Sequence, residues 1–226
     1  MLDKRLQAVA DMVPAGARVA DIGTDHAYLA AELWKRGAAA VIASDKNAGP
    51  CEAARATLLA EGLSEKIPVR QGDGLAVLVP GEADTLCIAG MGGRLIADIL
   101  EAEPEVTAAC RRLVLQPMNE AEALRRRLYA NGWYLAEESL AEAAGQLYVI
   151  LCAEQGEEKI AEDILYLAGP RLTEKKPGLW AAHLKGLIAK EKRAADGMAR
   201  SEAARATEKY ARLCQKIKEL EALLPC

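Results

Sequence analysis

The segment that most constrains the fold is Ala17–Leu29, which reads ARVADIGTDHAYL. Its apolar run ends at Ile22, Gly23 follows, and a group of polar residues comes next. A second apolar run ends at Asp45. An acid about twenty residues after a strand-ending glycine is typical of nucleotide-type cofactor sites, where that acid accepts ribose hydroxyls. The pattern predicts parallel strands with a cofactor site at their carboxyl ends.

The loop after Gly23 narrows the class of cofactor. It continues Thr24-Asp25-His26-Ala27 and therefore lacks the full G-x-G-x-x-G pattern. A dinucleotide pyrophosphate needs glycines for close backbone approach and a helix N-terminus for its charge. A cofactor without phosphate tolerates polar and acidic side chains here. We therefore predict S-adenosyl-L-methionine (SAM), which has an adenosine, a sulfonium and an amino-acid end.

Strand-like runs and helical patterns alternate along the first two thirds of the chain. The runs are Arg18–Ile22, Ala39–Ser44, Ile67–Gln71, Thr85–Ala89, Arg112–Gln116, Trp133–Ser139 and Leu147–Ala153. Helical patterns follow the first four at Leu29–Arg36, Pro50–Glu61, Leu75–Val79 and Gly92–Glu103. This rhythm predicts an α/β fold, a mostly parallel sheet with helices on both faces. The last two runs are close enough to form an antiparallel hairpin. By analogy of fold, this is the Rossmann-like arrangement of SAM-dependent methyltransferases.

The last part of the chain has a different pattern. Leu213, Ile217, Leu220 and Leu224 follow one another at coiled-coil spacing. Gly197 is expected to break two long helices that fold back as an antiparallel pair. We expect a cofactor domain over 1–156 and a helical coiled-coil domain over 157–226. A monomer is expected, and a dimer formed through the coil stays open as the alternative.

Charge is unevenly distributed between these two parts. The net charge is −4, yet residues 159–226 hold 14 Lys+Arg against 9 Asp+Glu, a net +5, so residues 1–158 hold 15 against 24, a net −9. A basic segment of this kind indicates a polyanionic partner, and solvated helices rich in lysine are the simpler alternative.

Several classes of protein are not expected. No apolar run approaches the length of a membrane span, and the N-terminal segment reads as an amphipathic helix and not as a signal peptide. Six cysteines without a C-x-x-C pair and only two histidines favour no metal site. A reducing, cytoplasmic compartment fits this cysteine usage.

Three acids follow or end strand-like runs. Asp21 is placed to hold the ammonium of the methionine end, with a helix cap as the alternative. Asp45 offers two oxygens to the ribose hydroxyls. Asp73, between Gly72 and Gly74, is placed to meet the adenine amino group, and an ordinary turn explains it equally well.

A second loop, Ala89–Gly93, reads AGMGG after the fourth run. The fourth strand should adjoin the first, at the switch point where ligands bind in open α/β sheets. The glycines would let backbone lie against a flat ligand, although a strand-to-helix turn is the alternative. After the fifth run, Pro117 ends the strand and Asn119 is expected to cap the next helix. His26 beside Asp25, with no suitable Ser or Cys nucleophile, does not indicate a hydrolase.

The motifs DIGTDHAYL, ASDKNAGP, GDGL, IAGMGG and LVLQPMN, in this order, resemble the bacterial tRNA (adenine-22-N1)-methyltransferase family, TrmK. The resemblance covers most of residues 1–155 and continues into the helical tail. It implies a SAM-dependent Rossmann-like domain and a C-terminal coiled-coil domain that helps to bind tRNA. Ala30 stands where the family usually has proline, which concerns helix initiation more than ligand contact.

The resemblance also implies site residues. Those expected to line the cofactor pocket are Asp21, Gly23, Asp45, Asn47, Asp73 and Gly74. Those expected near the transferring methyl group and the target base are Asp25, His26, Gly90 and Met91. Gly90 is counted with the cofactor residues, and Asp25, His26 and Met91 are the candidate catalytic residues.

The expected reaction is SAM-dependent methylation of N1 of an adenine in tRNA, with position 22 implied by the resemblance alone. Neutral adenine N1 has a free lone pair, so positioning is the main requirement and no strong base is needed. Asp25 could ease the charge that develops on the base, or it could only cap the helix expected near Ala27. The alternatives are methylation of a small molecule or another RNA, and a non-catalytic cofactor-fold protein that binds RNA. A SAM titration and a test of methyl transfer to tRNA separate these three functions.

Overall fold

The computed structural model describes residues 2–225 and divides into two units, residues 1–158 and 159–226. The first unit is built on one seven-stranded sheet in the order β3-β2-β1-β4-β5-β7-β6. The strands are β1 (Arg18–Ile22), β2 (Ala40–Asp45), β3 (Val69–Gln71), β4 (Thr85–Met91), β5 (Arg112–Pro117), β6 (Trp133–Ala143) and β7 (Gln146–Gln155). The first five are parallel, and β7 pairs antiparallel with both β5 and β6. The predicted Rossmann-like fold is therefore confirmed.

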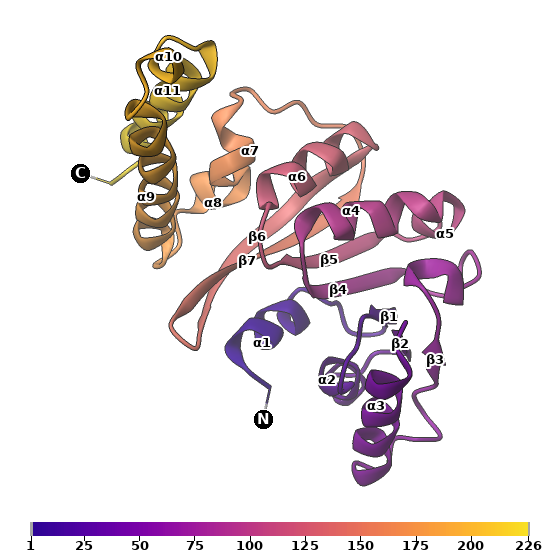
Figure 1. The fold of residues 1–226 in the computed structure, drawn as a ribbon. Coiled ribbons are helices and arrows are strands. Elements are labelled where there is room, and N and C mark those ends of the chain that lie inside the picture. The colour runs from indigo at the N-terminus through magenta and orange to yellow at the C-terminus, as the bar shows by residue number, and fades with distance from the viewer. Residues whose placement is uncertain (1, 226) are drawn as a thin grey trace. The chain divides into compact units, whose positions relative to one another are not determined.

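Helices cover both faces of this sheet (Figure 1). One face carries α1 (Lys4–Asp11), α2 (Tyr28–Lys35) and α3 (Ala48–Ala60), and the other carries α4 (Gly93–Ala102), α5 (Pro104–Ala108) and α6 (Ala121–Ala130). Side chains along each strand alternate between the two cores: Val41 packs with the first set of helices and Ile42 with the second. Burial on both faces explains why the strands read as short apolar runs.

Three expectations about this unit are wrong in detail. The helix expected over Leu75–Val79 is a single 3₁₀ turn, η1 (Gly74–Val77), and α5 was not expected. Asn119 does not cap α6, because Glu120, with φ 52°, lies between them. The Asn119 carbonyl instead accepts a hydrogen bond from the Gly93 amide at 3.1 Å, so this residue ties two loops together.

The hairpin of β6 and β7 is longer than its apolar runs indicated. It turns through Ala144 and Gly145, both with positive φ (49° and 73°). Two successive left-handed residues are the geometry of a tight hairpin turn. The predicted antiparallel pairing is confirmed, and the strands extend it into segments of mixed polarity.

The second unit is entirely helical within the described residues. Its helices are α7 (Ile164–Ala168), α8 (Pro170–Lys175), α9 (Trp180–Ala199), α10 (Glu202–Arg205) and α11 (Glu208–Ala222). Gly197 is not the break between the long helices, because it lies inside α9. The chain turns instead at Ser201 and Thr207, whose hydroxyls cap α10 and α11. A glycine weakens a helix by only about 1 kcal/mol, which packing overcomes here.

The two long helices of this unit pack against each other (Figure 1). Leu184 and Ile188 of α9 and Ile217 and Leu220 of α11 are buried. An ion pair of 2.6 Å joins Lys192 to Glu221, near the end of α11. Leu213 and Leu224, the other two residues of the expected seam, are only half-buried. Supercoiling of this helix pair stays a prediction.

Candidate functional site

Two cavities lie at the carboxyl ends of β1, β2 and β4. The larger measures about 470 Å³ and the smaller about 140 Å³. Gly23, Asp45 and Met91 line both, so the cavities adjoin. The larger one is also lined by Asp21, Asp25, His26 and Gly90, and the smaller one by Asn47, Asp73 and Gly74. The fold thus brings all ten predicted site residues to one place, although they come from four separate loops.

Gly23 has a backbone conformation that favours glycine, at a point where the first loop approaches the Met91 side chain. Its φ is +75°, and a Cβ added to it would lie 2.1 Å from the Cε of Met91. The amides of Gly23 and Thr24 both donate to the carbonyl of Ser44, each at 2.8 Å, which fixes the first loop to the end of β2. The positive φ favours glycine at position 23, and the missing side chain leaves the backbone there able to approach a ligand closely.

Asp21 is a buried acid on β1, with 3 % of its surface exposed. Its Oδ2 accepts a hydrogen bond of 2.6 Å from the Thr24 hydroxyl. Burial raises the pKa of this carboxyl from 3.8 to about 6, and the Thr24 bond opposes the rise. Ala27 precedes α2 (Tyr28–Lys35) and gives it no side-chain cap, but the Ala30 amide in the first turn of this helix bonds to the Asp21 carboxyl and also lowers its pKa. The helix-cap explanation of Asp21 therefore stands beside its position in the cavity wall. A buried carboxylate facing a cavity is suited to a cationic ligand group.

Two acids lie at the ends of β2 and β3. Asp45, the last residue of β2, lines both cavities, and Asp73, which follows β3, lines the smaller one. Asp45 Oδ1 accepts a hydrogen bond of 2.9 Å from the Asn47 amide, which leaves lone pairs on both oxygens for hydroxyl donors. Asp73 is exposed and its side chain caps nothing, although it precedes η1. Both carboxylates can therefore accept hydrogen bonds from a ligand.

The first loop continues through two strained residues. Asp25 and Ala27 have φ of 52° and 55°, values that non-glycine residues rarely adopt. The Asp25 side chain is 71 % exposed and lies 3.7 Å from His26 Nε2. The expected alternative, that Asp25 caps α2, is wrong because the residue before that helix is Ala27 and the first-turn amide of Ala30 bonds to Asp21. Strain of this kind persists where the surrounding structure holds a loop for a purpose.

The glycines around the end of β4 have different roles. Gly90 has φ +80° and lines the larger cavity. Gly93 has a packing role, because a Cβ there would lie 2.5 Å from the Glu120 carbonyl oxygen. Gly93 therefore fits the strand-to-helix turn, which was the alternative explanation of this loop.

The larger cavity also has walls that the sequence did not indicate. Arg5 on α1, Tyr28 at the start of α2, Met118 after β5 and Tyr148 on β7 all line it. Tyr28 is 52 % exposed and stacks on His26, with 5.5 Å between ring centroids and 19° between planes. Tyr28 and Met118 lie within motifs of the family resemblance but were not among the predicted site residues. Nothing in the local sequence marks Arg5 or Tyr148, because the fold alone brings α1 and β7 to this edge.

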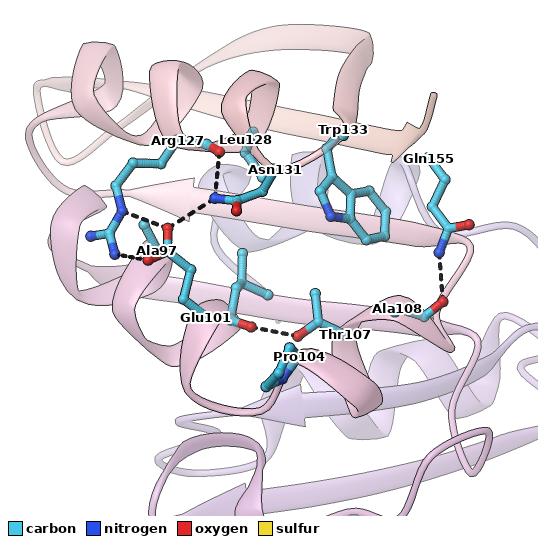
Figure 2. A pocket seen from close by; sticks show the side chains of 12 residues that line it. Ala97, Glu101, Pro104, Thr107, Ala108, Arg127, Leu128, Asn131, Trp133 and Gln155 are labelled. Carbon is cyan, nitrogen blue, oxygen red and sulfur yellow. Dashed lines mark hydrogen bonds and ion pairs between the residues drawn. The ribbon is translucent and has the colours of Figure 1, made fainter. Parts of the chain in front are cut away.

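A further cavity of about 600 Å³ lies elsewhere, between α4, α5 and α6 (Figure 2). Its polar groups pair with one another: Glu101 receives hydrogen bonds from Arg127 Nε at 2.7 Å and Asn131 Nδ2 at 3.0 Å. Gln155 Nε2 donates to the Ala108 carbonyl at 2.6 Å. None of the predicted site residues lines it. It is larger than either cavity of the site, but its polar groups are largely satisfied within the protein.

Two negative findings concern the described residues only. No group of three or more His, Cys, Asp or Glu side chains among residues 2–225 is arranged to hold a metal ion. Within the same residues, no helix combines the length and the apolar composition that crossing a bilayer requires.

The fold and the site together define a class, the methyltransferases, and the Methyltransferase domain family matches residues 2–151. The chain is 43 % identical to the tRNA (adenine(22)-N(1))-methyltransferase of Bacillus subtilis over 181 residues. The aligned region covers 77 % of this chain and 76 % of the B. subtilis protein. The chain belongs to this family of tRNA methyltransferases, as the resemblance of the motifs implied.

Solved structures agree with this assignment. The crystal structure of the B. subtilis m1A22 tRNA methyltransferase TrmK has a TM-score of 0.88 and 35 % identity, over 100 % of this chain and 99 % of that one. A Streptococcus pneumoniae protein solved in complex with S-adenosyl-L-methionine has a TM-score of 0.85 and 36 % identity, over 100 % of both chains.

Proposed function

We propose that this protein transfers a methyl group from SAM to N1 of an adenine in tRNA, at position 22 as in the B. subtilis relative. The observation that supports the proposal best is the meeting of all ten predicted residues around two adjoining cavities. Kinship to the B. subtilis enzyme supports the choice of cofactor and substrate.

The donor and acceptor groups of the site fit SAM. The buried Asp21 suits a cationic amino-acid end, Asp45 suits a ribose diol, and Asp73 suits an adenine amino group. The missing side chain at Gly23 allows close contact with the backbone. When bound, SAM supplies an electrophilic methyl group on a sulfonium.

The residues around the larger cavity would position the base. Adenine N1 carries its own lone pair, so the protein needs to orient the ring and exclude water more than to remove a proton. Because N1 lies on the Watson–Crick edge, the target base must leave its pair and enter a pocket. The Asp25 carboxylate at the rim would then favour the positive charge that grows on the methylated base.

The second unit would supply affinity for the RNA. Its bases outnumber its acids by 14 to 9, and Lys185, Lys190 and Arg193 are exposed along α9. Lysine and arginine bind nucleic acid through phosphate contacts that weaken as salt is added. The five described cysteines are free, which fits a reducing cytoplasm, and we propose that the protein acts there as a monomer.

The test is methyl transfer from labelled SAM to two tRNAs that differ only in having adenine or guanine at position 22. We expect one methyl group on the adenine tRNA and none on the guanine tRNA, with N1 as the modified atom by mass spectrometry of nucleosides. Methylation of both tRNAs, or of neither, would refute the proposed substrate. SAM binding without any transfer would indicate the non-catalytic alternative.

A further inference from the structure

We propose that Tyr148 forms the wall against which the target adenine stacks, and that Arg5, held by Gln116, positions that wall. The inference rests on the proposed function and names side chains that would recognise its substrate. Both Tyr148 and Arg5 line the larger cavity together with Asp25 and Gly90.

Gln116, near the end of β5, is fully buried, and both the oxygen and the nitrogen of its side-chain amide form hydrogen bonds. Its Oε1 accepts hydrogen bonds from Arg5 Nη1 at 2.6 Å and from the Gly90 amide at 3.1 Å. Its Nε2 donates to the Pro117 carbonyl at 2.9 Å. The Gln116 side chain thus connects α1 to Gly90, near the end of β4. A buried polar group whose hydrogen bonds are satisfied makes such a connection rigid.

Arg5 in turn contacts the ring of Tyr148. Its guanidinium carbon lies 5.7 Å from the ring centroid, within cation–π distance. The Tyr148 hydroxyl donates to Gln146 Oε1 at 2.9 Å. The ring is therefore held at its face by α1 and at its hydroxyl within β7, and it is half-buried in the cavity wall.

This wall suits a neutral flat base better than a phosphate. Proteins that take up unpaired nucleotides stack the base on aromatic rings or on arginine guanidinium planes. Arg5 is partly neutralised by Asp3, whose carboxylate lies 3.7 Å away, and one of its amino groups is taken by Gln116. The remaining surroundings include Asp21, Asp25 and Asp45, which would repel a phosphate. We therefore assign contact with the base to Tyr148 and a positioning role to Arg5.

The first experiment compares Tyr148→Ala with Tyr148→Phe in the full chain. A base that loses its stacking partner should lower kcat/KM for tRNA by roughly five- to a hundredfold in Tyr148→Ala. The phenylalanine variant keeps the ring and should retain most of the parental value. SAM affinity and melting temperature should be unchanged in both variants. Gln146→Ala removes the acceptor of the Tyr148 hydroxyl and should behave like Tyr148→Phe, because both variants lose the same hydrogen bond and keep the ring.

A second readout does not depend on methyl transfer. A tRNA with 2-aminopurine at the target position fluoresces strongly when that base is unstacked and weakly when it stacks on a ring. With SAM-loaded protein, Tyr148→Ala should give brighter emission than the parent and Tyr148→Phe should match the parent. Arg5→Ala should give intermediate emission and raise KM for tRNA more than it lowers kcat, and Arg5→Lys should recover part of the loss.

The result that would overturn the proposal is a Tyr148→Ala variant with parental kcat/KM and parental emission. Tyr28→Ala makes the comparison sharper, because Tyr28 lines the same cavity and is the more exposed ring. If Tyr28→Ala alone brightened the probe, the stacking wall would be the first loop and the proposal would be wrong. A parent that quenches the probe but transfers no methyl group would refute the proposed function and leave the stacking wall supported.

Discussion

The two units of this protein handle charge in opposite ways. In residues 1–158, acids outnumber bases by 24 to 15, and several acids face the cavities at the strand ends. In residues 159–226, bases outnumber acids by 14 to 9, and many of them are exposed along α9 and α11. A small ligand is selected by a few fixed groups in a cavity, whereas a polyanion is attracted by charge spread over a surface.

The difference in packing follows the same division. The first unit has two cores, one on each face of its sheet, so its loops are held from both sides. The second unit buries a smaller set of apolar side chains, spread over α7, α8, α9 and α11. We therefore expect the first unit to fold and bind SAM alone, and the second to contribute to RNA binding without forming part of the cofactor site.

The largest effect should come from removing the second unit. A chain ending at Glu158 keeps every cavity residue and should bind SAM with parental affinity, measured by calorimetry. Its tRNA methylation should fall by roughly a hundredfold or more, because the phosphate contacts of the basic helices are lost. If the shortened chain methylated tRNA as fast as the parent, the division of labour between the units would be wrong.

The next effect concerns the ribose acceptor. Asp45→Ala should weaken SAM binding by roughly 30- to 150-fold, since hydrogen bonds to a charged acceptor contribute about 2–3 kcal/mol. The half-exposed position at the end of β2 should leave the melting temperature nearly unchanged. Asp11→Ala on α1, which removes an exposed partner of Arg36, is a matched control in which SAM affinity should not change. An unchanged dissociation constant in Asp45→Ala would remove this residue from the site.

The raised pKa of Asp21 predicts that SAM binding depends on pH. Because burial raises its pKa to about 6, the carboxyl is mostly protonated at pH 5 and mostly ionised at pH 7. A cationic ligand prefers the ionised form, so SAM affinity should rise roughly tenfold from pH 5 to pH 7. Stability should move the other way, since a raised pKa favours the folded state at low pH and the advantage is lost as pH rises through about 6. Asp21→Asn should abolish the slope of SAM affinity, and a slope that survived would assign it to another group.

The smallest effect is expected for Asp25→Asn. A buried electrostatic group at a reaction centre can contribute a hundredfold or more, but the Asp25 side chain is 71 % exposed, so water screens its charge. We expect turnover to fall roughly three- to tenfold in single-turnover assays, with a near-parental KM and melting temperature. A loss above a hundredfold would mean that bound tRNA buries this carboxylate, and parental turnover would exclude it from catalysis.

Much of the first unit could be predicted because its signals are local. Four of the five parallel strands are short apolar runs with a glycine or an acid at or just after their end, and those ends became the site. Ten site residues were predicted from such ends and from family motifs. Arg5 and Tyr148 were not, because α1 and β7 carry no such signature, and Gln116 stands in the motif LVLQPMN, which does not reveal its contact with Arg5.

The errors have physical reasons as well. Gly197 was expected to end a helix, but α9 continues through it because caps at Ser201 and Thr207 decide where the turn falls. Gly93 was grouped with glycines that either contact a ligand or form a strand-to-helix turn, and the nearby Glu120 backbone supports the second explanation. In both cases one residue had two valid local explanations, and only tertiary packing selects between them.

The most direct test of the central claim is an NMR titration of the full, isotopically labelled chain with SAM. Our account predicts saturable shifts confined to the amides around the two adjoining cavities, with Gly23, Gly74 and Gly90 as reporters. The amides around the cavity between α4, α5 and α6, reported by Asn131 and Gly132, should not move. Shifts that clustered around Asn131 and Gly132 and left Gly23 and Gly90 unmoved would contradict the assignment of the cofactor site to the strand ends.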